Sequence, residues 1–178
     1  ADRVTRRAGR RPLVSVGDTP TAVVAECFDG VDELRPGNFV FFDLVQRALG
    51  VCRGEQIAVA AALPVVGVYP ERGEIVLHGG AVHLSKDRLE TPRGPLYGLL
   101  ARRAEAAAGP DALGAPDDDA PVISLSQEHA VVRAPHRVGD LAVGDVALVF
   151  PVHSCLTAEM YGEYLTTGGE RLERFTRW

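Results

Sequence analysis

Two side chains separated by one residue, His153 and Cys155, are of types that can bind a metal ion. They follow an apolar run at 146–150 that is typical of a buried strand. In an extended segment, side chains at positions i and i+2 point the same way, so both could reach one ion. An imidazole and a thiolate favour zinc over magnesium or calcium, and two protein ligands leave positions open for water or substrate. The spacing alone favours a simpler interpretation, in which Cys155 is a small buried hydrophobic residue.

The first part of the chain has the pattern of a strand, a sharp turn and a helix. Residues 13–16 predict a strand, Gly17-Asp18-Thr19 a turn, and 21–28 a short helix with Thr19 as N-cap and Pro20 in its first turn. Such a helix N-terminus offers backbone N–H groups to an anion. The signal is weak by itself, because every βα unit has such a turn.

A second βα unit follows and then the pattern changes. Residues 33–38 predict a turn and 39–42 a strand; Asp43 caps a helix that runs to Leu49 and stops at Gly50. The β-α-β-α order of residues 12–50 indicates the end of an α/β unit with parallel strands. Residues 51–178 predict mostly antiparallel β structure, a sandwich or a barrel, which makes the chain α+β and mostly β overall.

Within residues 51–178, several segments carry separate predictions. Pro64 argues against one helix over 56–68 and favours two strands or one bent strand. Residues 100–108 have helical composition, whereas 109–121, with its three aspartates, predicts a solvated loop. Further strands are expected at 74–78, 122–125, 130–133 and 146–150, and a closing hairpin at 161–178.

Composition narrows the class of protein. The 178 residues carry a net charge of −5, which argues against nucleic acid as a partner. Three cysteines are few and odd in number, so a disulfide framework is not expected. No apolar run is long enough for a membrane span and no signal peptide is visible, which predicts a cytoplasmic protein. Lys86 is the single lysine, so lysine chemistry must use it or a residue outside this sequence.

Four stretches, in this order, resemble the D-serine dehydratase/D-threonine aldolase family, and 79–85 is similar to it as well. The four are Ser15-Val16-Gly17-Asp18-Thr19-Pro20-Thr21, residues 33–43, Ser126-Gln127-Glu128-His129, and Pro151-Val152-His153-Ser154-Cys155. The family consists of pyridoxal-phosphate enzymes with an alanine-racemase-like fold, a TIM-type barrel followed by a β-domain. The resemblance implies that residues 1–50 are the C-terminal end of the cofactor-binding barrel and 51–178 the β-domain.

The resemblance also implies site residues. The turns matching Gly17 and Thr19, and Gly37, Asn38 and Phe39, would hold the phosphate of pyridoxal 5'-phosphate, in keeping with phosphate sites after the last strands of such barrels. His153 and Cys155 would hold zinc beside the cofactor. The Schiff-base lysine of the family lies far upstream of residue 1, and Lys86 matches no such position, so the catalytic residue is expected outside this sequence.

The implied activity is that of a lyase on D-3-hydroxy amino acids, and the cysteine at 155 leans toward the dehydratase branch, which gives a 2-keto acid and ammonia. A homodimer acting on a small D-amino acid is expected, with neither nucleic acid nor membrane as a partner. Retro-aldol cleavage and racemisation are variants of the same site. A different class, a non-catalytic metal-binding or dimerisation domain, also fits. His83, Ser85, Glu128 and His129 are further candidates to face the site, and structural roles are at least as common for such residues.

Overall fold

The computed structural model describes residues 2–102 and 113–174. It forms two compact units, Ala1–Val40 and Phe41–Trp178. In the first unit, β1 (Ser15–Val16) pairs in parallel with β2 (Glu33–Leu34), and α2 (Thr19–Val24) connects them, which confirms the predicted parallel β-α-β order. The unit also contains α1 (Asp2–Ala8) and a 3-10 helix, η1 (Gly37–Val40).

Three local predictions in this part of the chain are wrong. Asp18 rather than Thr19 is the N-cap of α2, because its carboxylate accepts the Thr21 N–H at 2.9 Å. The segment 33–38, predicted as a turn, supplies β2. The strand expected at 39–42 is instead η1 followed by Phe42 at φ 52°, a backbone conformation that cannot continue a strand.

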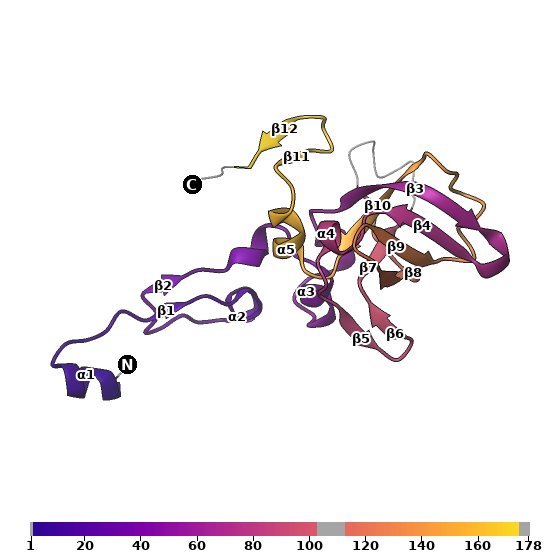
Figure 1. Ribbon diagram of the computed structural model, residues 1–178. Coiled ribbons are helices and arrows are strands. Elements are labelled where there is room, and N and C mark those ends of the chain that lie inside the picture. The colour runs from indigo at the N-terminus through magenta and orange to yellow at the C-terminus, as the bar shows by residue number, and fades with distance from the viewer. Residues whose placement is uncertain (1, 103–112, 175–178) are drawn as a thin grey trace. The chain divides into compact units, whose positions relative to one another are not determined.

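The second unit is built on a closed barrel of six antiparallel strands in the order β10-β3-β4-β9-β8-β7 (Figure 1). Of the two architectures that the sequence left open, a sandwich and a barrel, the structure has the barrel. Closure leaves this sheet without free edges. Its strands are β3 (Ala61–Tyr69), β4 (Glu74–His78), β7 (Gly98–Ala101), β8 (Pro116–Leu125), β9 (His129–Arg133) and β10 (Val146–Pro151).

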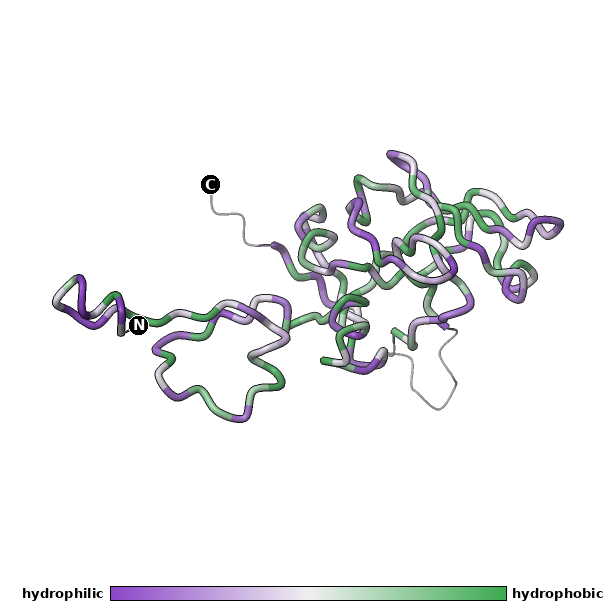
Figure 2. Tube along the Cα trace, turned by 90° about the horizontal axis from the view of Figure 1, so that it is seen from below, coloured by the Kyte–Doolittle hydropathy of each residue, from purple (hydrophilic) through white to green (hydrophobic). Residues whose placement is uncertain are grey.

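The alternation of side chains along β3 shows which face of the strand fills the interior of the barrel. Ala61, Leu63 and Val65 are buried while the residues between them, including Pro64, face outward. The inward residues pack on Ile75 and Leu77 of β4 and on buried residues of the other strands. In Figure 2, hydrophobic residues run through these strands and polar ones mark many of the turns. A second buried cluster joins Leu44 to Phe150 and Val152 beside the barrel.

The remaining elements of the second unit are short: α3 (Leu44–Ala48), η2 (Gly54–Gln56), η3 (Pro70–Arg72), α4 (Ala81–Leu84), β5 (Leu89–Thr91), β6 (Gly94–Leu96), α5 (Ser154–Glu159), β11 (Glu163–Leu165) and β12 (Arg171–Glu173). Asp43 caps α3 as predicted, and β11 pairs with β12 as the closing hairpin. Among the described residues, no helix is long and apolar enough to cross a membrane.

The predicted helix at 100–108 falls partly on β7, and its residues 103–108 lie outside the described residues. The solvated loop expected at 109–121 is wrong where it is described, because β8 begins at Pro116 and Asp117 is buried. Burial is possible because the Asp117 carboxylate accepts hydrogen bonds from His136 Nε2 at 3.0 Å, the Asp119 N–H at 3.2 Å and Arg137 at 3.3 Å. Buried carboxylates need such partners.

The network around Asp117 predicts an acid-sensitive barrel. Burial by itself would raise the pKa of Asp117, but the hydrogen bonds from His136, Asp119 and Arg137 outweigh it and lower the pKa. A depressed folded-state pKa stabilises the protein above the unfolded value, about 3.9, and this contribution is lost as pH falls through the lower folded value. We expect the urea midpoint of the parent to fall more steeply below about pH 4 than that of Asp117→Asn. If the urea midpoints of the parent and of Asp117→Asn fall in parallel with pH, the hydrogen bonds to Asp117 do not stabilise the barrel as stated.

Candidate functional site

In the first unit, the turns that follow β1 and β2 lie together. The Asn38 N–H, in η1, donates to Thr19 Oγ1 at 3.0 Å, and Thr19 is buried at the start of α2. A Cβ on Gly17 would lie 3.1 Å from the guanidinium of Arg35, so the missing side chain lets this cation approach the turn. Because β1 and β2 are parallel, both turns leave the same end of the strand pair. The predicted phosphate residues Gly17, Thr19 and Asn38 are therefore neighbours in space.

Backbone turns and a cation suit an anion such as the phosphate of pyridoxal phosphate. Two groups limit how it could be held. The Asn38 N–H already donates to Thr19, and the Asp18 carboxylate accepts the Thr21 N–H. Hydrogen bonding from the side chain and then the backbone of Thr21 lowers the pKa of Asp18. A phosphate here would depend on other N–H groups of the turns and on Arg35. Gly37 has open space where a Cβ would be, and Phe39 is exposed.

In the second unit, the predicted metal pair lies where β10 meets α5. His153 has extended backbone angles and is the N-cap of α5, whereas Cys155 is already in the helix. The prediction that both lie on one extended segment is therefore wrong. The helix starts at Ser154, and the thiol of Cys155 is exposed rather than buried as a small hydrophobic residue.

A buried carboxylate explains why the helix begins at this point. Asp43 accepts the Gln46 N–H at 2.9 Å as the cap of α3, and with its other oxygen accepts the Ser154 N–H at 3.0 Å. Asp43 and Ser154 are both fully buried. Since Ser154 lies between His153 and Cys155, this one side chain fixes the backbone between the two candidate ligands. The capping role was evident from the sequence; the second hydrogen bond was not.

The imidazole of His153 also has a partner that the sequence did not reveal. Its Nδ1 lies 2.7 Å from Oδ2 of Asp87, in the loop after α4. A carboxylate can only accept, so Nδ1 carries the proton and Nε2 keeps a free lone pair in the neutral ring. Metal-binding histidines commonly have this arrangement. The donor set, a directed imidazole and an exposed thiol, therefore fits zinc, with open coordination positions.

Nothing else in the described ranges completes the ligand set: residues 2–102 and 113–174 contain no cluster of three or more His, Cys, Asp or Glu side chains placed to hold a metal ion. A site on His153 and Cys155 would need non-protein ligands or groups outside these ranges. That is the composition of a catalytic rather than a closed structural zinc site.

Two more stretches singled out in the sequence, 79–85 and 126–129, dock on each other through their backbones. The N–H groups of Gly79, Ala81 and Val82 donate to the carbonyls of Glu128, Ser126 and Gln127 at 2.7, 2.9 and 3.1 Å. A Cβ on Gly80 would lie 2.5 Å from the Ser126 carbonyl oxygen, so only glycine allows this approach. The docked backbone begins α4, the helix that carries His83.

Three histidine rings lie close together beside these two stretches. His78 and His129 are register partners on β4 and β9, and their rings lie 5.6 Å apart; the His83 ring lies 5.5 Å from His78 and 6.4 Å from Tyr161. Within the described part of the chain, His83 Nδ1 and the Tyr161 hydroxyl are buried without a hydrogen-bond partner, and burial raises the pKa of Tyr161. His83 is thus partly buried in a packed cluster, while Glu128 and His129 are exposed.

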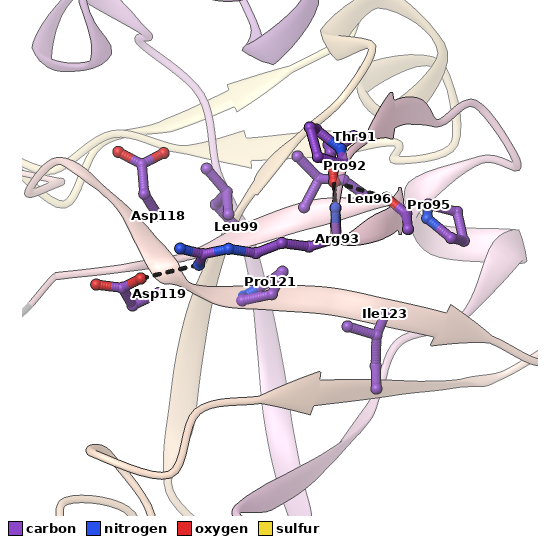
Figure 3. A pocket seen from close by; sticks show the side chains of 11 residues that line it. Thr91, Pro92, Arg93, Pro95, Leu96, Leu99, Asp118, Asp119, Pro121 and Ile123 are labelled. Atoms are coloured by element: carbon purple, nitrogen blue, oxygen red, sulfur yellow. Dashed lines mark hydrogen bonds and ion pairs between the residues drawn. The ribbon is translucent and has the colours of Figure 1, made fainter.

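A separate pocket of about 300 Å³ lies between the β5–β6 hairpin and β8. Figure 3 shows Arg93 extending across it to Asp119, with a hydrogen bond of 3.1 Å. Its other lining residues are mainly Pro, Leu and Ile. None of the sequence-predicted site residues line it, so it is not part of the candidate site.

Comparison with known proteins agrees with this architecture. Residues 58–167 match the family described as "Putative serine dehydratase domain", and the chain belongs to this family. The match covers the barrel and the His153–Cys155 segment. The family match and the barrel therefore define residues 58–167 as a serine dehydratase domain.

Individual relatives are dehydratases. The chain is 32% identical to a D-threo-3-hydroxyaspartate dehydratase of Delftia sp. over 86% of its length, and 30% identical to a D-serine dehydratase of Dictyostelium discoideum over 85%. It spans 40% and 38% of those proteins, less than half of each.

Solved structures have the same fold. An alanine-racemase-like protein from Idiomarina loihiensis matches 99% of this chain and 47% of its own, with a TM-score of 0.80 at 31% identity. Two structures of D-threo-3-hydroxyaspartate dehydratase variants match with TM-scores of 0.79, at 30% and 29% identity, over 99% of this chain and 48% and 46% of theirs. One variant has a cysteine replaced by alanine and is in the metal-free form. The other has a histidine replaced, two positions earlier in the sequence.

Proposed function

We propose that this chain is the C-terminal part of a pyridoxal-phosphate- and zinc-dependent lyase that removes water from D-3-hydroxy amino acids, giving a 2-keto acid and ammonia. The observation that carries the proposal is the His153–Cys155 pair: an imidazole directed by Asp87 and an exposed thiol two residues later, at the end of a barrel strand. The family membership and the dehydratase relatives support the reaction class.

The metal component has independent support from the relatives. Their replaced histidine and cysteine have the spacing of His153 and Cys155, and the variant without the cysteine is in the metal-free form. Zinc suits one imidazole and one thiolate. We therefore assign His153 Nε2 and Cys155 Sγ as its ligands in this chain.

Each group of residues has a separate task. The turns at Gly17, Thr19, Gly37, Asn38 and Phe39 would hold the cofactor phosphate, aided by Arg35. Bound pyridoxal phosphate supplies an electron sink and bound zinc a Lewis acid. His153 and Cys155 would place the metal where the β-hydroxyl leaves, and Asp43 would keep the backbone between them fixed.

The test is the metal content of the complete protein. Elemental analysis of protein purified without chelator should give about one zinc per chain, as for a single catalytic site. His153→Ala should lose the metal and the activity together. A matched control is His136→Ala, which removes an imidazole elsewhere in the barrel unit. Zinc-free parent protein, with His153→Ala fully active, would contradict the proposal.

The proposal extends to the assembly and its partners. A homodimer acting on a small D-amino acid fits the family, and the net charge of −5 argues against nucleic acid as a partner. Light scattering on the complete protein measures the assembly directly.

A further inference from the structure

The contact between Asp87 and His153 joins residues far apart in the chain at a short distance. Nδ1 of His153 and Oδ2 of Asp87 are 2.7 Å apart, a charge-assisted hydrogen bond in length. The pair is only half-buried, with 37% of the His153 side chain and 49% of the Asp87 side chain exposed. Exposed pairs of this kind add little to folding stability. Stability therefore does not account for the contact.

The backbone that carries Asp87 is held in an unusual conformation. Ser85 has φ 67° and ψ 179°, a region almost confined to glycine. Ser85 is buried, and its hydroxyl accepts the Asp87 N–H at 3.2 Å. A strained residue persists only where its surroundings fix it, and such residues concentrate at functional sites.

A second contact connects the two sides of this arrangement. The Thr157 hydroxyl, in α5, donates to the Leu84 carbonyl at the end of α4 at 3.2 Å, and both residues are buried. Asp87 follows α4 and His153 precedes α5. The loop with the carboxylate is thus fixed against the helix that begins at the imidazole.

We propose that Asp87 is a positioning residue for His153: it holds the neutral imidazole in the Nδ1–H tautomer and directs the Nε2 lone pair at the zinc ion. This inference rests on the proposed function, in which His153 is a zinc ligand. A free imidazole in water prefers the opposite tautomer, with the proton on Nε2, which cannot bind a metal through that nitrogen. Asp87 removes this competition and also restricts rotation of the ring.

The experiment uses the complete protein and two substitutions at Asp87. Zinc affinity, measured by competition with a chromophoric chelator, should fall 10–100-fold in Asp87→Ala, the range for losing such a partner. Asp87→Asn should lie between parent and Asp87→Ala, because the amide oxygen can still accept from Nδ1 but its NH₂ group can instead donate to Nδ1 and favour the wrong tautomer. Asp140→Ala is the matched control: the Asp140 carboxylate also accepts a side-chain hydrogen bond, from Arg137 at 2.9 Å, and is 46% exposed.

A second readout reports the tautomer without metal or activity. ¹⁵N NMR of metal-free protein labelled at histidine, with His153 assigned by comparison with His153→Ala, should show the Nδ1–H form in the parent and mainly the Nε2–H form in Asp87→Ala. A purely structural role for Asp87 would move neither the tautomer nor the zinc affinity.

Failures of the two proposals are distinguishable. Full zinc binding by His153→Ala would overturn the proposed function and this inference with it. Loss of zinc in His153→Ala, together with parental affinity and an unchanged tautomer in Asp87→Ala, would overturn the inference alone.

Discussion

Replacing Cys155 with serine in the complete protein should slow elimination from D-serine by on the order of a hundredfold while leaving binding of pyridoxal phosphate almost unchanged. A serine hydroxyl is a much poorer zinc ligand than a thiolate, so the metal should bind weakly. Without it, the departing hydroxyl loses a partner that stabilises its charge. The predicted phosphate turns lie in the other compact unit, so the cofactor should remain bound.

The informative comparison is between elimination and exchange of the α-proton. In deuterated water, Cys155→Ser should still take up deuterium at the α-carbon of D-serine, because exchange does not require the hydroxyl to leave. Cys27→Ser is the matched control, since Cys27 is also exposed but lies in the other unit. Equal loss of exchange and elimination would mean that Cys155 holds the site together. Unchanged elimination would exclude it from the mechanism.

Asp43→Ala should lower the free energy of unfolding by about 2–5 kcal/mol, because it leaves two buried N–H groups without their acceptor. These belong to Gln46 in α3 and Ser154 in α5, at 2.9 and 3.0 Å from the carboxylate. The same substitution frees the backbone between His153 and Cys155, so zinc affinity should fall as well. Urea unfolding and chelator competition measure the two effects.

A graded variant and a control sharpen this prediction. Asp43→Asn keeps one acceptor oxygen, so its free energy of unfolding should lie between those of the parent and Asp43→Ala. Asp145→Ala removes a carboxylate that accepts a single backbone N–H, that of Ala142 at 2.8 Å, at an exposed position. If Asp43→Ala unfolds no more easily than Asp145→Ala, the buried hydrogen bonds of Asp43 contribute less than assigned.

The sequence predicted those features that depend on neighbours along the chain. Short apolar runs predicted β4, β9 and β10 within a residue or two, since such a run is a local signal of a buried strand. Asp43 was recognised as a cap from its position before a helix. The ordered stretches that end at Cys155 predicted the family, which the comparison confirms.

The structure decided the features that depend on residues far apart. Cys155 lies in a helix because Asp43, more than a hundred residues earlier, caps the Ser154 N–H; the local sequence predicted an extended segment. Asp117 is buried rather than solvated because His136 and Arg137 reach it from beyond β9.

Asp87 is the clearest example of a residue whose role depends on contacts far away in the sequence. Nothing near it in the sequence predicts a role, and it meets His153 only because Ser85 adopts a strained turn and α4 packs on α5. The sequence by itself therefore determined which residues are chemically suited to bind zinc. The tertiary structure decided how they are oriented, because the partners that orient them come from distant parts of the chain.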